Sequence, residues 1–558
     1  MGKKNVERVV RKAAVVKEPA GSAAGRMNKI HLPLFALALV IVFMRFWNLE
    51  GIPGGAYVDE TSIGYNARCV LITGADEHGV RLPLDFKAFG EYKNPIFIYS
   101  LVPLIRLFGA SVWVLRLGAC IFGLGCVIFI GLIAWHSLGR YSWAIFTFLL
   151  AGTMPWLFTL SRVAFEAVSF PFFIAAAWWS WLRATKQDSD RWFLISSAAW
   201  GISLFAYSTA RLLVPLLFIA LISCYLKMLR ERPVRFLAAL LPFLLCVALL
   251  ISWSLRNPGT LTARFEYLSI MKDNADPLAV AFRFLSNYLS YLSPLFLFVR
   301  GDPNLRHHTA QGGELFLFTF PALLMGLWYA WQNRQKALEL FTLLGFLLFP
   351  VAASLTRDEH HALRTINAVP FAILLIVWGF RELADWARNK RLLVGLFAVI
   401  ALIETTTFYY DYFARYQERA QAYFCAGLPQ ALKTAFASKQ GPLFYSPLAF
   451  RDEDFAVREP YIQLLFFGKL DPAAFRAKGL AGFGIYPYQK GTVLPAGSVL
   501  ILKDGDNLYT ASHRTLLSKN PDPAPQKSTL IEEITVSISS DGAAPDSLAS
   551  HYRVYRIP

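Results

Sequence analysis

The chain has 558 residues, of which 55% are hydrophobic and 15% aromatic, and its mean hydropathy is +0.42. This composition excludes an ordinary soluble enzyme and indicates a polytopic membrane protein. The formal net charge of +17 does not predict nucleic-acid binding, because the basic residues lie largely between apolar segments, where they report orientation and contact with anionic lipid.

Eleven segments are long and apolar enough to be candidate membrane spans, which need about 20 such residues. They are residues 30–47, 112–136, 142–160, 165–183, 191–207, 211–228, 235–255, 314–332, 338–355, 364–381 and 392–411. Residues 1–29 precede them and are rich in Lys and Arg separated by small residues, so we predict a disordered basic cytoplasmic tail. The first apolar segment is long enough to remain as a span rather than to act as a cleaved signal.

Charge bias decides where the shorter apolar stretch 96–109 lies. It contains Pro103 and Arg106 and is short for a crossing, so we predict a re-entrant or interfacial helix. With this assignment the short basic loops between the later spans face the cytoplasm, as the positive-inside rule requires. If the stretch crossed instead, these loops would all face outward.

The polar loop between the first two long spans, residues 48–111, combines acids with a lysine and a proline that opens an apolar helix. An acidic pair in such a loop is most often solvated surface when it stands alone. Here it stands beside further polar groups just outside a span, which suits chemistry on a substrate whose tail lies in lipid. The candidate site residues of this loop are Asp59, Glu60, Glu91, Tyr92 and Lys93.

This loop resembles the first external loop of the polyprenyl-phosphate-sugar-dependent transferases of the GT-C fold, family 39 type. That group contains the protein mannosyltransferases and the lipid A aminoarabinose transferase. The matching residues are Asp59-Glu60, Gly64, Asn66, the turn 73–79, Pro83 and the segment 91–95. The resemblance extends over about residues 50–410, with further matches at 155–166, 293–313 and 355–370. It implies a GT-C transmembrane catalytic domain over residues 30–413.

Two span-end motifs on the same predicted outer side add candidates. Arg162 and Glu166 stand where one span ends and the next begins, and a similar motif lies beside the catalytic loop in the resembling family, although many members carry Asp at the acidic position. A lone Arg there is otherwise an interfacial anchor. Tyr207 and Arg211 are read equally well as an interfacial pair or as a contact to the substrate head group.

Two later loops complete the candidate set. Arg300 and Asp302 begin a polar hinge that ends in His307-His308, and a metal site is one interpretation of that pair. Because adjacent histidines point apart on a helix or strand, we predict no metal ligands. The second loop contains His361 and Arg364, and Arg364 opens a span where a charge is costly unless it meets an anion such as phosphate. An ion pair with Asp358 or Glu359 is the alternative.

Residues 414–558 differ in composition, because their apolar runs are short and separated by Pro, Gly and Asp. The runs PLFYS, YIQLLFF, SVLILK, ITVSI and HYRVYRI are typical of strands. We therefore predict a soluble α/β domain on the outer face. Its role is not evident from the sequence.

The resemblance implies transfer of a sugar from a polyprenyl-phosphate donor to a hydroxyl of a glycan, lipid A or protein, with inversion at the anomeric carbon. In this hypothesis Asp59 is the general base, Glu60 a positioning acid, and Lys93, Arg162 and Arg364 bind the donor phosphate. The enzyme would lie in the plasma (inner) membrane with its N-terminus cytoplasmic and its C-terminal domain outside. No cofactor is predicted, and the sequence leaves open whether a divalent metal assists.

Two other classes of protein remain as alternatives. A transporter or lipid flippase would show charged residues and broken helices at the middle of the bilayer, often in two related halves, and the sequence shows neither feature. A catalytically inactive glycolipid-binding homologue is the second alternative, against which Asp59 argues.

Overall fold

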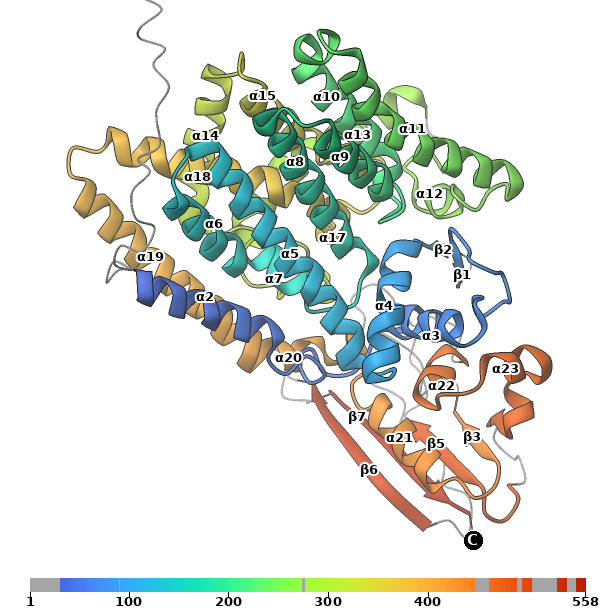
Figure 1. Cartoon of the computed structure of the whole chain (residues 1–558). Coiled ribbons are helices and arrows are strands. Elements are labelled where there is room, and N and C mark those ends of the chain that lie inside the picture. The colour runs from blue at the N-terminus through green and yellow to red at the C-terminus, as the bar shows by residue number, and fades with distance from the viewer. Residues whose placement is uncertain are drawn as a thin grey trace, which may run out of the picture. The chain divides into compact units, whose positions relative to one another are not determined.

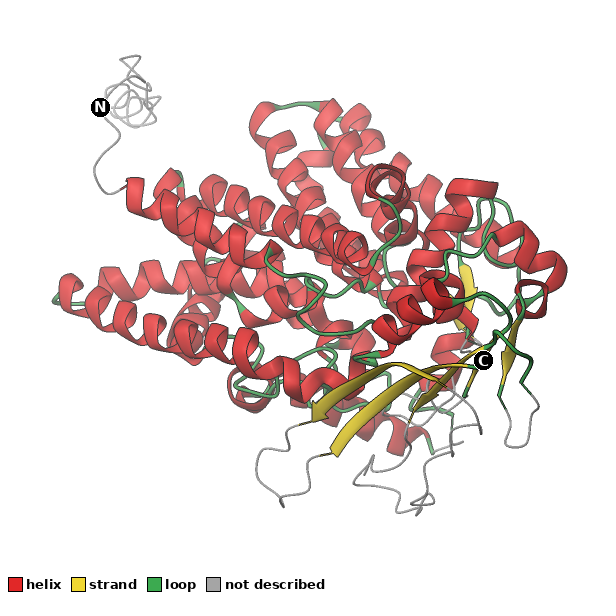
Figure 2. Cartoon of the chain, turned by 90° about the horizontal axis from the view of Figure 1, so that it is seen from below, coloured by secondary structure: helices red, strands yellow, loops and turns green. Residues whose placement is uncertain are grey.

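Helices make up most of the protein, as its apolar composition predicts (Figures 1 and 2). The computed structural model describes residues 31–89, 91–272, 276–446, 461–488, 494–503, 529–538 and 548–557, so the predicted tail at 1–29 lies outside the described residues. Residues 1–40 and 41–558 form separate units, and every site discussed below belongs to the second.

Each of the eleven predicted apolar segments contains a helix. These helices are α2 (His31–Phe46), α5 (Val112–Leu138), α6 (Tyr141–Thr153) with α7 (Pro155–Leu160), α8 (Ser169–Gln187), α9 (Asp190–Ser203), α10 (Ala210–Arg230), α11 (Pro233–Arg256), α14 (Phe320–Gln332), α15 (Ala337–Leu348) with α16 (Val351–Ser354), α17 (Ala362–Thr365) with α18 (Val369–Trp386), and α19 (Lys390–Tyr410). By length and composition, 6 helices among the described residues can cross a membrane, including Val112–Leu138 and Pro233–Arg256. The number of eleven spans stays a prediction.

Small residues let the apolar helices approach each other closely. A Cβ on Gly326 of α14 would lie 1.9 Å from the backbone oxygen of Leu375 in α18, and a Cβ on Gly379 would lie 1.7 Å from that of Ala322. Only glycine fits such contacts, which are typical of helix packing in membranes. Helix α5 packs against α6 and α8, and α9 packs against α8 and α11.

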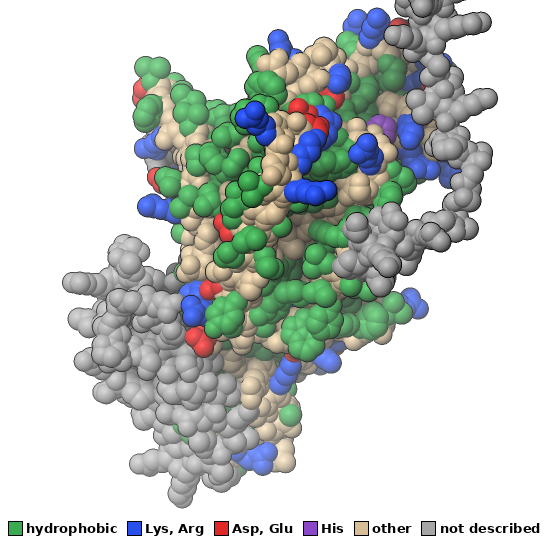
Figure 3. All heavy atoms as spheres, turned by 90° about the vertical axis from the view of Figure 1, so that its left-hand side faces the viewer, with side chains coloured by type: hydrophobic (Ala, Val, Ile, Leu, Met, Phe, Trp, Pro, Cys, Tyr) green, Lys and Arg blue, Asp and Glu red, His purple; other side chains and the backbone are tan. Residues whose placement is uncertain are grey.

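Other helices present apolar side chains outward. Within the span that begins with α19, only 11% of the apolar window is buried, against 94% for the span Ala362–Trp386. Figure 3 shows hydrophobic side chains over much of one face, with many Lys and Arg side chains near one end. Soluble proteins rarely expose apolar patches that extend over several helices, whereas such a surface suits contact with lipid. The protein is therefore an integral membrane protein.

The first polar loop folds into α3 (Val58–Thr73), the antiparallel hairpin of β1 (Phe86–Ala88) and β2 (Glu91–Lys93), and α4 (Pro95–Phe108). Helix α3 packs against α4 and α5 and also against α22 (Tyr461–Phe467). A Cβ on Gly64 would lie 2.6 Å from the Phe466 ring, which explains why this position of α3 carries glycine. The predicted interfacial location of α4 stays a prediction.

The segment between α11 and α14 contains α12 (Ala263–Leu268), α13 (Pro277–Leu292), the π-helix η2 (Leu295–Arg300) and the 3-10 helix η3 (Leu317–Thr319). In the stretch 282–298, aromatic and small polar residues alternate over too few positions for a span, so the sequence predicts an interfacial helix, and the stretch is helical over most of its length. Exposed apolar side chains on α13 include Leu278, Phe282 and Leu285. A contact with the membrane surface stays a prediction for this helix.

The C-terminal residues contain a 5-stranded sheet in the order β4-β3-β5-β7-β6. Its strands are β3 (Leu443–Tyr445), β4 (Ile485–Pro487), β5 (Val499–Lys503), β6 (Thr529–Ile538) and β7 (Leu548–Arg556). The β3 strand is parallel to β4 and β5, whereas β5, β7 and β6 are antiparallel. The helical pieces before and between the strands are η5 (Asp411–Arg415), α20 (Tyr416–Ala420), η6 (Gln421–Phe424), α21 (Leu428–Ser438), α22, α23 (Pro472–Lys478) and η8 (Leu480–Phe483).

Four of the five predicted strand segments contain strands, but the run YIQLLFF is the helix α22. The strand prediction for this run was wrong because five consecutive residues, Ile462–Phe466, are buried on all sides. A short apolar run buried in this way has no strand or helix periodicity, so its packing against α3 decides the outcome. The predicted domain boundary at residue 414 stays a prediction.

Candidate active site

Asp59 and Lys93 form an ion pair at the centre of the first polar loop. Asp59 lies in the first turn of α3 and Lys93 ends β2, and the Lys93 Nζ lies 2.8 Å from Asp59 Oδ1. The Asp59 side chain is 20% exposed, whereas that of Lys93 is 3% exposed. Burial alone lowers the pKa of Lys93, but the carboxylates of Asp59, Glu91 and Glu166 raise it above its ordinary value. The neighbouring carboxylates therefore favour the charged form of Lys93, although its side chain is buried.

Asn94, the residue after Lys93, connects this pair to two distant helices. Its backbone N–H donates to Glu166 Oε2 at 2.6 Å and its side-chain Nδ2 donates to Glu166 Oε1 at 2.8 Å. Arg211, in the first turn of α10, donates from Nη2 to Asn94 Oδ1 at 2.9 Å. The structure thus gathers four sequence-predicted residues around the start of α4. We call Asp59, Lys93, Asn94, Glu166 and Arg211 the Asp59 cluster.

Glu60, the neighbour of Asp59, is occupied by structural bonds. Its carboxylate accepts two hydrogen bonds from Arg116 at 2.9 Å, one from the Tyr57 N–H and one from the Ala164 N–H. The Glu60 and Arg116 side chains are both completely buried. The predicted positioning role suits Glu60, because it joins the start of α3 to α5 and to the segment before Glu166.

Arg162 is also occupied. All five of its N–H groups have acceptors, namely the Tyr412 hydroxyl and the backbone oxygens of Met44, Arg45, Trp47 and Ile52. These bonds hold the turn that follows α2. Because no N–H group remains for a ligand in this arrangement, we leave Arg162 out of the phosphate-binding set that the sequence suggested.

Arg364 pairs with Asp358, the alternative that the sequence left open. Its Nη1 lies 2.5 Å from Asp358 Oδ2 and donates to the Thr356 hydroxyl at 2.7 Å. Asp358 is half-exposed, so this pair faces solvent on one side. Of the other predicted residues, Glu91 and Tyr92 are half-buried in β2, and Arg300 is exposed at the end of η2. Tyr92 and Arg300 lie outside the contacts that define the Asp59 cluster, whereas Glu91 acts on it through its charge, which favours the protonated form of Lys93.

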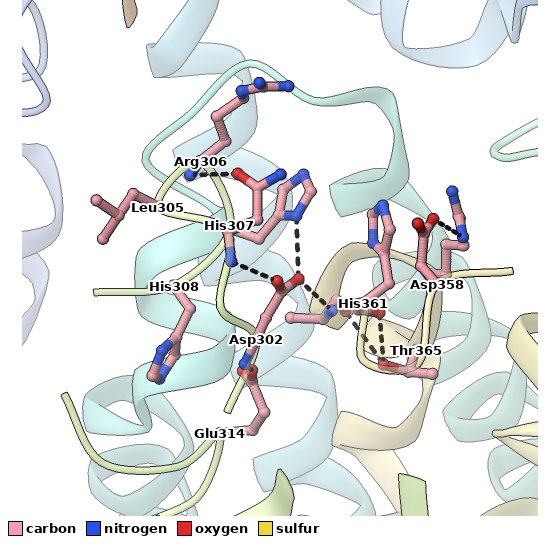
Figure 4. Close-up of polar contacts among 12 residues, drawn as sticks. Asp302, Leu305, Arg306, His307, His308, Glu314, Asp358, His361 and Thr365 are labelled. Atoms are coloured by element: carbon pink, nitrogen blue, oxygen red, sulfur yellow. Dashed lines mark hydrogen bonds and ion pairs between the residues drawn. The ribbon is translucent and has the colours of Figure 1, made fainter. Parts of the chain in front are cut away.

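A second group of polar side chains forms around Asp302 (Figure 4). Asp302 Oδ1 accepts the Asn304 N–H at 2.8 Å, and Oδ2 accepts the Ala362 N–H at 2.8 Å and lies 3.0 Å from His307 Nδ1. Burial alone raises the pKa of Asp302, but His307 and the backbone donors lower it below its ordinary value. The carboxylate is therefore ionised. The bond to Ala362 places the preceding residue, His361, beside His307.

His307 and His308 point apart, as the sequence predicts. Figure 4 shows His308 directed away from His307 and Asp302. Its Nδ1 accepts the Ala310 N–H and its Nε2 faces the Gly313 backbone oxygen at 3.3 Å, while burial lowers its pKa. The neighbour of His307 is instead His361, whose ring centroid lies 4.4 Å from that of His307. We call Asp302, His307 and His361 the Asp302 cluster.

Two aromatic residues connect the clusters. The Arg306 guanidinium lies over the Tyr57 ring at 4.6 Å from its centroid, and Tyr57 is the residue before α3, which carries Asp59. The Phe165 ring, next to Glu166, contacts both Tyr57 and His307, with ring centroids 6.3 Å and 5.5 Å apart. Sequence reasoning named residues of both clusters but missed this connection, which no spacing along the chain encodes.

Other residues of the loop that resembles the transferases make structural contacts and do not belong to the Asp59 cluster. Asn66 of α3 and Glu77 bind each other twice, through Nδ2 to Oε1 and through the Glu77 N–H to Oδ1, both at 3.1 Å. Asp76 Oδ1 accepts the N–H groups of His78 and Val80, which closes the turn. Burial raises the pKa of Glu77 to about 7. These contacts fix the end of α3 before the chain enters the β1–β2 hairpin.

Residues 93–253 match the sequence model of the family described as dolichyl-phosphate-mannose-protein mannosyltransferase. This match begins at Lys93 and includes Glu166 and Arg211. No curated protein sequence matches the chain.

Among solved structures, ArnT from Cupriavidus metallidurans bound to undecaprenyl phosphate aligns with a TM-score of 0.51 and 13% identity, over 85% of this chain and 93% of that one. ArnT in the apo state aligns with a TM-score of 0.51 and 14% identity, over 85% of this chain and 92% of that one. This chain has the GT-C fold. The predicted resemblance to family 39-type glycosyltransferases is confirmed over residues 93–253, and the solved structures confirm the fold.

Proposed function

We propose that this GT-C protein transfers a sugar from a polyprenyl-phosphate donor to a hydroxyl acceptor on the outer face of the membrane, with inversion at the anomeric carbon. The observation that carries the proposal is the Asp59–Lys93 pair, 2.8 Å apart in the loop that resembles the transferases. It combines a partly exposed carboxylate with a buried amine whose charged form is favoured by its carboxylate neighbours. Deprotonation of an alcohol and release of a lipid phosphate need these two groups.

The lipid class is supported by the comparison with ArnT, whose structure holds undecaprenyl phosphate. A phosphate at the head of a lipid would reach a loop that adjoins apolar helices. Lys93 is the cation that we assign to this phosphate. Arg211 is a second cation in the same cluster, because it donates a hydrogen bond to Asn94, the residue after Lys93. Arg364 is a further candidate, because the half-exposed Asp358 could give way to a phosphate. Fixed cations in a dry site stabilise developing phosphate charge strongly.

In the proposed reaction, the arriving phosphate attracts Lys93, which leaves Asp59 less strongly paired and more basic. The acceptor oxygen forms a bond to the anomeric carbon as its proton passes to Asp59. At the same time the bond between the anomeric carbon and the phosphate oxygen breaks, and the lipid phosphate leaves with the negative charge that Lys93 stabilises. A single displacement of this kind inverts the anomeric centre.

The function is tested by mass spectrometry of surface glycans, glycolipids and glycoproteins from cells with and without the gene. We expect one sugar to disappear from an acceptor and its polyprenyl-phosphate donor to accumulate, with recovery on complementation by the parental gene but not by Asp59→Asn. The proposal is overturned if none of these pools changes and the purified protein binds no undecaprenyl phosphate.

A further inference from the structure

We propose that Asp302, His307 and His361 form a binding site for a divalent transition-metal ion of the Zn²⁺ type. One ligand atom from each residue lies within 4.8 Å of the other two. The three residues come from two loops that are separated in sequence, and they were brought together by folding. This inference does not depend on the proposed function, because it rests on the ligands alone.

The type of donor atom selects the type of metal. Two imidazole nitrogens and one carboxylate oxygen suit Zn²⁺ and similar ions, whereas Mg²⁺ and Ca²⁺ prefer sites made of oxygen atoms. Three protein ligands leave one coordination position for water or another ligand, as in catalytic zinc sites. The site would thus hold a metal that is accessible to a small molecule or an anion.

The Asp302 carboxylate is held in place before any metal arrives. The N–H groups of Asn304 and Ala362 fix its two oxygens, each at 2.8 Å. The Asp302 N–H donates to Glu314 Oε1 at 2.9 Å, which anchors the backbone as well. Such secondary contacts orient metal ligands and strengthen binding. The same bond to Ala362 positions His361, whose backbone oxygen accepts the Thr365 hydroxyl at 3.0 Å.

Two of the three ligand atoms are already spaced as in a metal site, and the third residue has to turn towards them. Tetrahedral Zn²⁺ with bonds of about 2.0–2.1 Å places its ligand atoms roughly 3.3 Å apart. The Asp302 Oδ2 and His307 Nδ1 atoms are 3.0 Å apart, so they need to separate only slightly when a metal replaces the proton between them. The His361 ring stacks on that of His307, with centroids 4.4 Å apart and planes at 30°, so it has to rotate out of this stack to direct a nitrogen at the same metal. His361 is half-buried and lies at the end of a loop, which leaves room for this movement.

The test is metal binding by the purified full-length chain in detergent, with any affinity tag removed and bound metal stripped by a chelator. Equilibrium dialysis against Zn²⁺, Mn²⁺ or Mg²⁺ with elemental analysis measures stoichiometry and affinity. We expect one Zn²⁺ per chain and much weaker binding of Mg²⁺. His361→Gln should lower the Zn²⁺ affinity at least about tenfold, since even secondary-contact changes cost about 10- to 100-fold.

His360→Gln is the matched control, because His360 is the adjacent histidine but stacks on Phe296, with ring centroids 5.1 Å apart, and approaches the Ser290 hydroxyl. It should bind Zn²⁺ as the parental chain does. Co²⁺ added in place of Zn²⁺ should give visible absorption bands that are absent in His361→Gln. Equal Zn²⁺ affinity in the parental, His361→Gln and Asp302→Asn chains overturns the proposal, as does no binding in the parental chain. If Asp302→Asn does not fold, His361→Gln decides alone.

Discussion

Glu60 and Arg116 form a two-point ion pair in which both side chains are completely buried. Removing one partner of a buried pair leaves the other charge without compensation, which costs about 3–5 kcal/mol. We therefore expect Glu60→Gln to lower the thermal unfolding midpoint of the purified protein strongly. Scanning fluorimetry or circular dichroism in detergent measures this midpoint.

Glu50→Gln is the control for this prediction, since the Glu50–Lys433 pair is half-exposed on both sides. Exposed pairs contribute little to stability, so this variant should melt like the parental protein. A Glu60→Gln protein with an unchanged midpoint would show that the Glu60–Arg116 pair does not hold the loop.

Lys93→Gln is expected to weaken binding of undecaprenyl phosphate. The change removes the buried cation assigned to the phosphate, and truncating one member of a desolvated charge pair typically costs about 2–5 kcal/mol. Lipid binding measured by native mass spectrometry or by scintillation proximity checks this. Lys87→Gln is the control, because Lys87 lies opposite Tyr92 on the same hairpin but is exposed. Equal affinity in both variants would remove Lys93 from the phosphate site.

The helical architecture could be predicted because hydrophobicity along the chain encodes it directly. Each apolar segment identified in the sequence contains a helix, and the polar loop with Asp59 and Lys93 was recognised from its residues. The wrong strand prediction at 461–467 arose where hydrophobicity along the chain does not distinguish a strand from a helix. Residues 462–466 are buried on all sides by α3 and the rest of the fold, and such a short, mostly apolar run carries no periodicity.

The roles of charged residues could be predicted only in part, because their partners are distant in sequence. Arg162 looks like a ligand for phosphate until its donors are traced to backbone oxygens about 110 residues earlier. His307 looks like half of a pair with His308, yet its ring stacks on His361. Spacing shows which residues can react, and only the fold shows which of them are already bound to each other.

Glu77 should make stability fall as pH rises. Its pKa is about 7 in the folded protein and 4.5 ordinarily, so between these values the folded state retains a proton that the unfolded state has lost. Stability therefore decreases as pH rises through this window, by about 3 kcal/mol in all. Glu77→Gln abolishes this loss and should melt higher than the parental protein at pH 8, but with little difference at pH 5.

Melting curves from pH 5 to pH 8 check the prediction for Glu77. Glu418→Gln serves as its control, because Glu418 is exposed and its variant should follow the parental curve. If the melting temperatures of the parental and Glu77→Gln proteins change with pH in parallel, the raised pKa of Glu77 is not the cause of the pH dependence.

Topology is tested by cysteine labelling of sealed, right-side-out vesicles with an impermeant maleimide. We expect His78→Cys and Lys433→Cys to be labelled and Arg232→Cys to be protected until the membrane is opened, because the basic loop at Arg232 should face the cytoplasm. All three positions are exposed. The native cysteines are buried or half-buried and should give a low background. Protection of Lys433→Cys would refute the outer location of the C-terminal residues.

Asp59→Asn is the decisive variant for the chemistry. Asparagine keeps the size of the side chain and can still accept a hydrogen bond from Lys93, which lies 2.8 Å from Asp59, so the fold and the donor site should persist. It cannot take a proton at neutral pH. Loss of a well-placed general base slows a reaction about 100- to 10,000-fold, so turnover should fall by that factor while binding of undecaprenyl phosphate is retained. Transfer assays and lipid binding on the same preparation measure both.

The rival base is Glu60, and the two variants separate the assignments. The Glu60 carboxylate already accepts four hydrogen bonds in a buried site, so its loss should be seen first in stability. Asp59→Asn should instead fold and melt closer to the parental temperature than Glu60→Gln, because Glu91 and Glu166 still compensate the charge of Lys93, and it should be inactive. If Asp59→Asn folds, binds the lipid and turns over at the parental rate, Asp59 is not the base. If Glu60→Gln melts normally and is the inactive one, the proton passes to Glu60.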